Sequence, residues 1–323
     1  MTLYTVAIIH FLKLDESIEK IKIDKNVTIY SPKANKIPEL FTEKYKAYIG
    51  MDEANNYNLH PYIIVTHKNI QNDDLEIAKY HKIARTVISN YISSTWFVID
   101  NSFQTHRIHS YSPSLKYAIT TTPQSKQTNS IGKAEPTILD YKNLRKAKSI
   151  TKLVTNLLPN QILEPRNIEI KDEPTFMPSQ FSTTDQSTTT NFQRAIALLD
   201  DARKTSLKTA KITFYCSVLE SILSTSNSEV TNQISIRTAL FLGKNKDQRT
   251  EIYRIVKKAY DIRSCFIHGN KINSQTDKLL PDFSKKMDQI TRQLFINLLT
   301  QKKDFLDLKG NQIEDYFLNK LFN

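Results

Sequence analysis

The sequence predicts an α+β protein in which a mixed α/β N-terminal domain, residues 1–170, is followed by an all-α helical bundle, residues 192–323. In the first part short β-branched runs alternate with a helical pattern, whereas the second part has apolar residues at three-to-four spacing throughout. Residues 171–191 are rich in Pro, Ser and Thr and have no apolar period. This segment therefore predicts a linker or a long loop between the two parts.

The N-terminal part contains two kinds of apolar segment. Tyr62–Thr66 and Thr95–Asp100 are short, β-branched and bounded by polar residues, so we expect them to be buried strands. Asp74–Tyr91 and Thr137–Leu157 have apolar residues at helical spacing and predict helices. The polar segment Gln124–Pro136 between them predicts a loop.

The C-terminal part predicts an all-α bundle of about five helices with short connections. Its helical segments have stripes of apolar residues, and glycines stand where two of the helices should end. The predicted helices are Thr209–Leu223, Ser235–Leu242 ending at Gly243, a helix from the N-cap Asp247 to Gly269, one that starts near Pro281, and a short Glu314–Phe322.

The composition indicates a soluble, cytoplasmic protein. No apolar run approaches the roughly 18 residues of a membrane helix, so no membrane partner is expected. The apolar stretch Val6–Leu12 is short and has no basic residues before it, which argues against a signal peptide. Cys216 and Cys265 are the only cysteines, too few for a disulfide framework and wrongly spaced for a metal site.

The positive charge is unevenly distributed. The chain has a net charge of +12, and residues 192–323 hold 22 basic and 14 acidic side chains, a surplus of +8. A surface that binds a polyanion needs such a concentration, although a solvated lysine-rich surface explains it equally well. There is no P-loop and no glycine-rich dinucleotide turn, so we expect no nucleotide cofactor and no other cofactor.

An arginine and a histidine stand close together near the end of the predicted helix, in the segment Arg263–Gly269 with the sequence RSCFIHG. Arginine presents a planar fork that suits a phosphate, and histidine can exchange a proton near neutral pH. Together they are the minimum set of groups for cleaving RNA without a metal ion.

Three blocks of the C-terminal part resemble the HEPN superfamily (higher eukaryotes and prokaryotes nucleotide-binding), specifically its Apea-like branch. They are Tyr215–Leu223 (YCSVLESIL), Ile236–Gly243 (IRTALFLG) and Tyr253–Gly269 (YRIVKKAYDIRSCFIHG). The resemblance covers roughly residues 192–300 and is carried mainly by the third block. It implies an HEPN-like helical bundle that dimerises so that two Arg-x4-His motifs meet in one cleft.

The resemblance also implies a function. Many such proteins are metal-independent endoribonucleases of toxin–antitoxin, abortive-infection and other antiviral defence systems. Carried over residue by residue, the family's arginine falls on Arg263, its histidine on His268 and the polar residue after the arginine on Ser264. That polar position more often holds Asn or Asp in active members. The implied partners are RNA, a second copy of the chain, and a regulatory protein or antitoxin.

The chemistry of RNA cleavage agrees with a two-chain site. The 2′-hydroxyl must lose a proton and the leaving 5′-oxygen must gain one, so a single histidine cannot serve both transfers in one step. Residues five apart lie about 140° around a helix, so Arg263 and His268 do not lie one above the other. Lys257, Lys258 and Lys271 flank the motif and are candidate contacts for RNA phosphates.

Other interpretations stay open. Arg263 could pair with Asp261, and Cys265 suits a small buried side chain better than a nucleophile. The bundle could bind RNA or a nucleotide without cutting it, or act only in dimerisation. Asp100, His106 and His109 form a weaker candidate for a metal site, and we predict no metal there.

Overall fold

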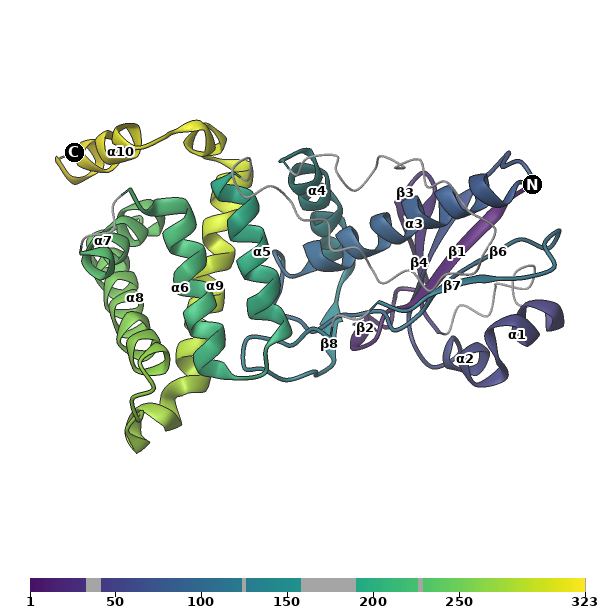
Figure 1. Cartoon of the computed structure of the whole chain (residues 1–323), viewed down its shortest axis with the longest axis horizontal. Helices are drawn as coiled ribbons and strands as arrows, with labels where there is room; N and C mark the ends of the chain where they lie inside the picture. Colours follow the sequence, from purple (N-terminus) through teal and green to yellow (C-terminus); the bar gives the residue numbers. More distant parts are fainter. Residues whose placement is uncertain (33–41, 124–125, 158–189, 226–228, 323) are drawn as a thin grey trace.

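The N-terminal sheet region and the C-terminal helical region lie next to each other along the long axis of the molecule (Figure 1). The computed structural model describes residues 1–32, 42–123, 126–157, 190–225 and 229–322. The predicted α+β class is confirmed, because the strands all precede the run of helices that fills the second half of the chain. Of the predicted linker, residues 171–191, the part up to residue 189 lies outside the described residues.

The N-terminal region is built on a six-stranded antiparallel sheet with the order β3-β4-β5-β1-β6-β7. In the central strand, Val6 is opposite Ile64 on one side and His109 on the other. A short parallel pair, β2 and β8, lies beside it. The strands are β1 Leu3–Ile8, β2 Leu12–Leu14, β3 Lys20–Asp24, β4 Val27–Tyr30, β5 Tyr62–His67, β6 Ile108–Tyr111, β7 Ile119–Thr121 and β8 Thr137–Leu139.

Both faces of this sheet are covered by helices because the apolar residues of the central strands point to both sides. Along β1, Ala7 joins the core beneath α3 (Asp74–Thr95) and α4 (Tyr141–Leu157). Its neighbours Val6 and Ile8 join the core formed with α1 (Glu43–Ile49) and α2 (Met51–Asn56) on the opposite face. Figure 1 shows α3 along one face and the α1–α2 pair on the other.

The C-terminal region packs α-helices around one apolar core. A capping box at Thr190 starts the first of them, in which the Thr190 hydroxyl accepts from the backbone of Gln193 and the Gln193 side chain accepts from the backbone of Thr190. Within the described part of this region the helices are α5 Asn191–Lys204, α6 Lys208–Leu223, α7 Val230–Leu242, α8 Lys246–Ile267, α9 Ser274–Thr300 and α10 Asn311–Phe322, with a 3-10 turn at Lys303–Asp307.

The two regions share apolar packing. Trp96 and Phe97, which follow α3, and Ile150 and Val154 on α4 are buried in the core of the C-terminal bundle. The side chain of Phe97 meets that of Phe295 on α9 edge to face, with 5.4 Å between the ring centroids. Residues from the first half of the chain therefore complete the core of the second half.

The predicted strand Thr95–Asp100 is wrong. Thr95 is the last residue of α3, and Trp96 is its C-cap in an α-helical backbone conformation. Trp96 and Phe97 are buried in the core of the helical bundle, whereas the half-buried Val98 and Ile99 also pack against the core of the sheet region. A short apolar run looks the same in a strand and in a helix end. The predicted strand Tyr62–Thr66 is confirmed as β5.

Several helix boundaries also differ from prediction. Thr137–Leu139 is strand β8, and α4 begins only after Asp140, whose carboxylate accepts from the backbone N–H of Asn143 at 2.7 Å. The N-cap of α8 is Asn245 and not Asp247, because the Asn245 side chain accepts from the backbone of Gln248.

Three further helices start earlier than predicted. Helix α10 starts at Asn311 and not at Glu314. Helix α7 starts at Val230 and not at Ser235. Helix α9 starts at Ser274, capped by Asn273, and runs through Pro281 without ending there. Across the described ranges, none of the helices has the length and the hydropathy needed to cross a lipid bilayer.

Candidate functional site

The Arg263–Gly269 segment ends α8 in a fixed geometry. His268 is the C-cap, and Gly269 has a φ of +68°, the left-handed conformation that favours glycine. The backbone N–H of Asn270 donates to the carbonyl of Cys265 at 2.8 Å, and that of Gly269 donates to Phe266 at 3.4 Å. These two bonds form a Schellman motif, so the position of His268 is set by the helix end itself.

Ser264 and His268 lie together on an exposed part of this helix end. Both residues are exposed, and the backbone N–H of His268 donates to the carbonyl of Ser264 at 3.0 Å, which is the last regular helical bond. Their side chains are therefore accessible to a ligand from solvent.

Arg263 faces the neighbouring helix α6. Its terminal nitrogen lies 3.6 Å from a carboxylate oxygen of Glu220, and its side chain is 33% exposed. Its guanidinium carbon lies 5.7 Å from the centre of the Tyr260 ring, within the range of a cation–π contact. The Tyr260 hydroxyl donates to the same oxygen of Glu220 at 2.9 Å. The structure thus groups Arg263 with Glu220 and Tyr260, and not with Asp261.

This grouping gives Arg263 a defined orientation. Burial, with Cys216 and Glu220 nearby, raises the pKa of Tyr260, so the phenol stays protonated and holds Glu220 by its hydrogen bond. Among the described residues the Nε atom of Arg263 has no hydrogen-bond partner. Glu220 stands 43 positions before Arg263 in the chain, and sequence spacing did not suggest that the two meet.

Arg263 and His268 are directed to different surroundings within one chain. Arg263 is half-buried against α6, whereas His268 is exposed at the helix end. No hydrogen bond joins the two in the part of the chain that the structure describes. The two side chains are therefore close in sequence but do not meet within a single chain, as the helical offset between them predicts.

The three candidate lysines have different environments. Lys258 lies 3.7 Å from a carboxylate oxygen of Asp261, which neutralises part of its charge. The Lys257 amine lies 5.6 Å from the centre of the Tyr253 ring. Lys271 is exposed in the loop between α8 and α9. Lys257 and Lys271 are therefore the more available cations.

Exposed apolar side chains stand on the last turn of α8 and on the first turns of α9. Phe266 is 37% exposed, Ile267 57% and Leu279, on the first turns of α9, 44%. Such a group beside polar site residues is typical of a surface that contacts another protein. Cys265, directly before Phe266 in the sequence, is partly buried, and its thiol is free.

The three residues of the weaker metal candidate each contact different partners. Asp100 accepts from the backbone and the hydroxyl of Ser130. His106 stacks on His10 with 3.9 Å between the ring centroids. His109 shares a hydrogen bond with the Thr120 hydroxyl at 2.8 Å and lies 3.5 Å from Glu53. Among the described residues no group of three or more His, Cys, Asp or Glu side chains has a metal-binding arrangement.

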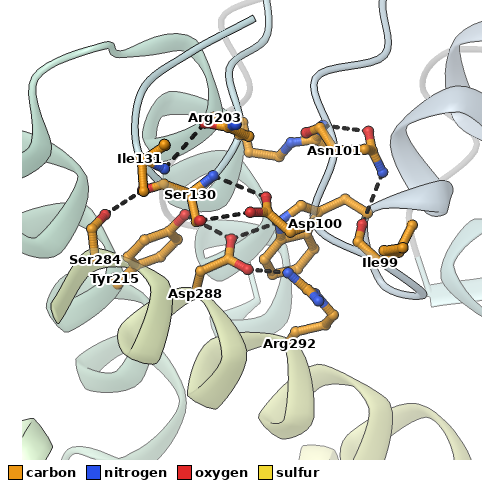
Figure 2. Close-up of polar contacts among 12 residues, drawn as sticks. Ile99, Asp100, Asn101, Ser130, Ile131, Arg203, Tyr215, Ser284, Asp288 and Arg292 are labelled. Atoms are coloured by element: carbon orange, nitrogen blue, oxygen red, sulfur yellow. Dashed lines mark hydrogen bonds and ion pairs between the residues drawn. The ribbon is translucent and has the colours of Figure 1, made fainter. Parts of the chain in front are cut away.

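A buried polar cluster joins the two regions of the molecule, and Figure 2 shows its contacts. At its centre, one carboxylate oxygen of Asp288 accepts from the indole N–H of Trp96 at 2.8 Å and from the Tyr215 hydroxyl at 2.9 Å. The other oxygen pairs with Arg292 one turn further along α9. Asp288 is 1% exposed, and its burial raises the pKa of the carboxyl group.

Loops of the N-terminal region complete the cluster. Arg203 on α5 donates to the carbonyl and the side-chain oxygen of Asn101 at 3.0 and 3.2 Å. Ser284 on α9 donates to the carbonyl of Ser130, whose hydroxyl donates to Asp100 at 2.5 Å. These hydrogen bonds join groups of both regions away from solvent, although the Nε atoms of Arg203 and Arg292 have no partner among the described residues. The cluster therefore fixes the two regions together.

One helix of the N-terminal region is strongly basic, although most of the net positive charge of the chain lies in the C-terminal region. Helix α4 carries five cations, Lys142, Arg145, Lys146, Lys148 and Lys152, and no acidic residue. Its residues Leu144, Ala147, Ile150 and Val154 are buried against the sheet and the bundle, so the basic residues lie on its outer face. Among the described residues only Lys148 of these five forms a close ion pair, with Asp24 at 3.6 Å, and Lys152 also lies near enough to help lower the pKa of Asp24.

Comparison with known proteins adds no further assignment. No family model, no curated protein and no solved structure matches the chain. The candidate site is therefore defined by its own geometry and by the sequence resemblance described above.

Proposed function

We propose that this protein is a metal-independent endoribonuclease of the HEPN type, acting as a conditional toxin in antiphage defence. One observation carries the proposal. The end of α8 holds His268 exposed in a fixed Schellman geometry, while Glu220 and Tyr260 hold Arg263 on the same last turns. A general acid–base group and a phosphate-binding fork are thus both preorganised at one helix end.

The reaction needs no group beyond these side chains and the RNA. The 2′-hydroxyl attacks the adjacent phosphorus while one histidine takes its proton. The bond from phosphorus to the 5′-oxygen then breaks, and a second histidine protonates that oxygen. The products are a 2′,3′-cyclic phosphate and a 5′-hydroxyl, so DNA can bind but is not cut.

Arg263 is proposed to bind the phosphate in the transition state. Its guanidinium can give two parallel hydrogen bonds to the non-bridging oxygens, which carry the developing negative charge. Its ion pair with Glu220 is at 3.6 Å and its side chain is 33% exposed, so part of the fork remains free for a ligand. Ser264, exposed beside it, supplies a hydroxyl for a further hydrogen bond to the RNA.

Two copies of the chain supply the two histidines. Phe266 and Ile267, directly before His268, are exposed, and so is Leu279 on the first turns of α9. These apolar side chains give this end of the bundle a surface suited to a second copy. Lys257 and Lys271 are the proposed contacts for flanking phosphates, with Lys258 as a weaker one because Asp261 is close to it.

Purified protein incubated with total RNA and excess EDTA tests the proposal. We expect cleavage that resists the chelator and is lost in Arg263→Ala and in His268→Ala. His60→Ala, far from α8 in the chain, serves as the matched histidine control and should cut like the wild type. Binding without cleavage, weakening steeply with salt, would instead favour a non-catalytic RNA-binding module.

Expression in cells gives an independent readout. The wild-type chain is expected to slow growth, and His268→Ala is expected to restore it. Equal growth with both chains, at equal protein levels, would contradict an active toxin under those conditions.

A further inference from the structure

A groove with a volume of about 900 Å³ lies at the other end of α8 from the Arg-x4-His motif. Its walls are the C-terminal end of α7, the first half of α8 and the second half of α9, and Lys302 and Lys320 also line it. The motif residues do not line it: along α8 the rise from Ile255, the lining residue nearest the motif, to Arg263 is roughly 12 Å, and from Arg249 to His268 roughly 28 Å. The groove is therefore separate from the proposed catalytic site.

Positive charge in the groove is not balanced by the protein. Five cations line it, against the single acid Glu251: Lys244, Arg249, Lys286, Lys302 and Lys320. None of the five forms an ion pair with another residue in the described ranges. Like charges gathered in one concave space repel one another and attract an anion.

Two of these cations are held in place by the backbone. The Nε atom of Arg249 donates to the carbonyl of Gly243 at 3.2 Å. A Cβ atom on Gly243 would lie 2.5 Å from the Arg249 side chain, so only glycine allows this approach. Lys302 donates to the carbonyl of Phe241 and lies 3.9 Å from the centre of its ring.

The environment of Lys302 also favours the binding of an anion. Burial and the nearby charge of Lys320 lower the pKa of Lys302 to about 8. A bound anion would offset both effects, because it pairs with the protonated amine.

The uncharged residues that line the groove suit a ligand with a flat ring and polar edges. Ile252, Ile255 and Ile290 contribute an apolar floor. Gln289, Gln293 and Asn297 follow one another at four-residue spacing on α9 and so form one row of amides along the groove. Each amide offers both a donor and an acceptor, as the edges of a nucleobase require.

We propose that this groove binds a phosphorylated nucleoside, with the phosphates on the five cations and the base between the isoleucine floor and the amide row. Its volume lies within the range of ordinary ligand sites, roughly 300–1,000 Å³. The ligand is either a free nucleotide or the phosphorylated 5′ end of an RNA strand. The proposal does not depend on the nuclease activity.

Isothermal titration calorimetry on the full chain tests the proposal with each of the four ribonucleoside triphosphates, inorganic tripolyphosphate, and a 5′-phosphorylated trinucleotide with 2′-O-methyl groups that cannot be cut. The test variant is Lys244→Glu with Lys286→Glu, both exposed lysines that line the groove. The matched control is Lys246→Glu with Lys285→Glu, which are exposed neighbours outside it.

We expect at least one triphosphate to bind the wild type and the control equally, and the test variant about tenfold more weakly or worse. Gln293→Leu should weaken nucleotide binding but leave tripolyphosphate binding unchanged, which keeps the test valid if the double variant unfolds. Tighter binding of the trinucleotide would assign the site to an RNA end, and tighter binding of the free nucleotide to a small effector. The absence of nucleotide binding at millimolar concentration, or tripolyphosphate binding as tight as any nucleotide, would overturn the proposal.

Discussion

Asp288 on α9 accepts a hydrogen bond from the indole of Trp96, 192 positions earlier in the chain, at 2.8 Å. Trp96 is the only tryptophan of the protein and is 1% exposed. The bond thus ties the end of α3 to the C-terminal bundle at a point that fluorescence can follow. It also places a buried carboxylate where the two regions meet (Figure 2).

Asp288→Ala is expected to destabilise the whole protein by about 3–5 kcal/mol, because it leaves the buried Trp96 and Tyr215 without their acceptor and the largely buried Arg292 without its charge partner. Asp282→Ala, at an exposed position of the same helix, should change the free energy of unfolding by less than about 0.5 kcal/mol. Urea unfolding followed by Trp96 fluorescence and by circular dichroism measures both effects.

The two probes should report one coincident transition in the wild type, since both regions share one core and one polar cluster. Separate transitions for the tryptophan signal and the helical signal would show that the regions unfold independently.

His81 is expected to make stability depend on acidity. Both ring nitrogens share hydrogen bonds with hydroxyls, of Ser110 and Thr121, at 2.7 Å, and burial lowers the pKa of His81 from 6.5 to about 4. Between these two values the unfolded chain binds more protons at this residue than the folded chain. The contribution of neutral His81 to the free energy of unfolding is therefore fully present above pH 6.5, and it is lost as the pH falls towards 4.

His81→Gln should consequently be less stable than the wild type at pH 7.5, with a difference that shrinks between pH 6.5 and pH 4. Thermal melts at half-unit pH steps give the measurement. A difference that stays constant across this range would mean that His81 does not titrate as proposed.

Glu220→Gln is expected to slow RNA cleavage by about tenfold to a hundredfold, because Arg263 loses the charge that orients it. Tyr260→Phe is the matched variant: it removes the other hydrogen bond to Glu220 but leaves the ion pair, so its effect should be smaller. Single-turnover rates and RNA affinity should be measured together. A loss of RNA affinity with an unchanged cleavage rate in Glu220→Gln would contradict a positioning role.

Ile267→Glu is expected to weaken the proposed dimer by about tenfold or more, since it places a charge among the apolar residues at the end of α8. Leu321→Glu on α10 is a close control, because Leu321 is 56% exposed and Ile267 57%. Figure 1 shows α10 at the opposite end of the bundle from the end of α8. Analytical ultracentrifugation of both variants provides the comparison, and an equal effect of the two would argue against a dimer surface at Ile267.

The helical half was largely predictable because its signals are local. The apolar stripe of α6 and the glycine after α8 determine these elements over a few residues. The caps were less certain, since Asn245 and Asp247 are both good N-caps and only the contact with Gln248 distinguishes them.

The other features of the fold and of the candidate site could not be predicted, because they depend on contacts between segments that are distant in the sequence. The apolar residues Trp96 and Phe97 fit a strand as well as a helix end, and only the bundle core decides between them. The hairpin of β3 and β4 has short strands and was not predicted from the sequence. At the candidate site, Arg263 and His268 were proposed from their spacing together with the family resemblance, but the partner Glu220 required the packing of α6 on α8.

The central claim is that RNA is cut at a site built from two chains, and mixed dimers test it most directly. One chain is wild type, and the other, separately tagged, carries Arg263→Ala and His268→Ala. Cleavage of end-labelled RNA in EDTA is then measured for the purified mixed dimer and for the wild-type dimer. We predict cleavage by the wild-type dimer and almost none by the mixed dimer, because one histidine cannot serve both proton transfers. Half of the wild-type rate in the mixed dimer, or no cleavage by either, would contradict the claim.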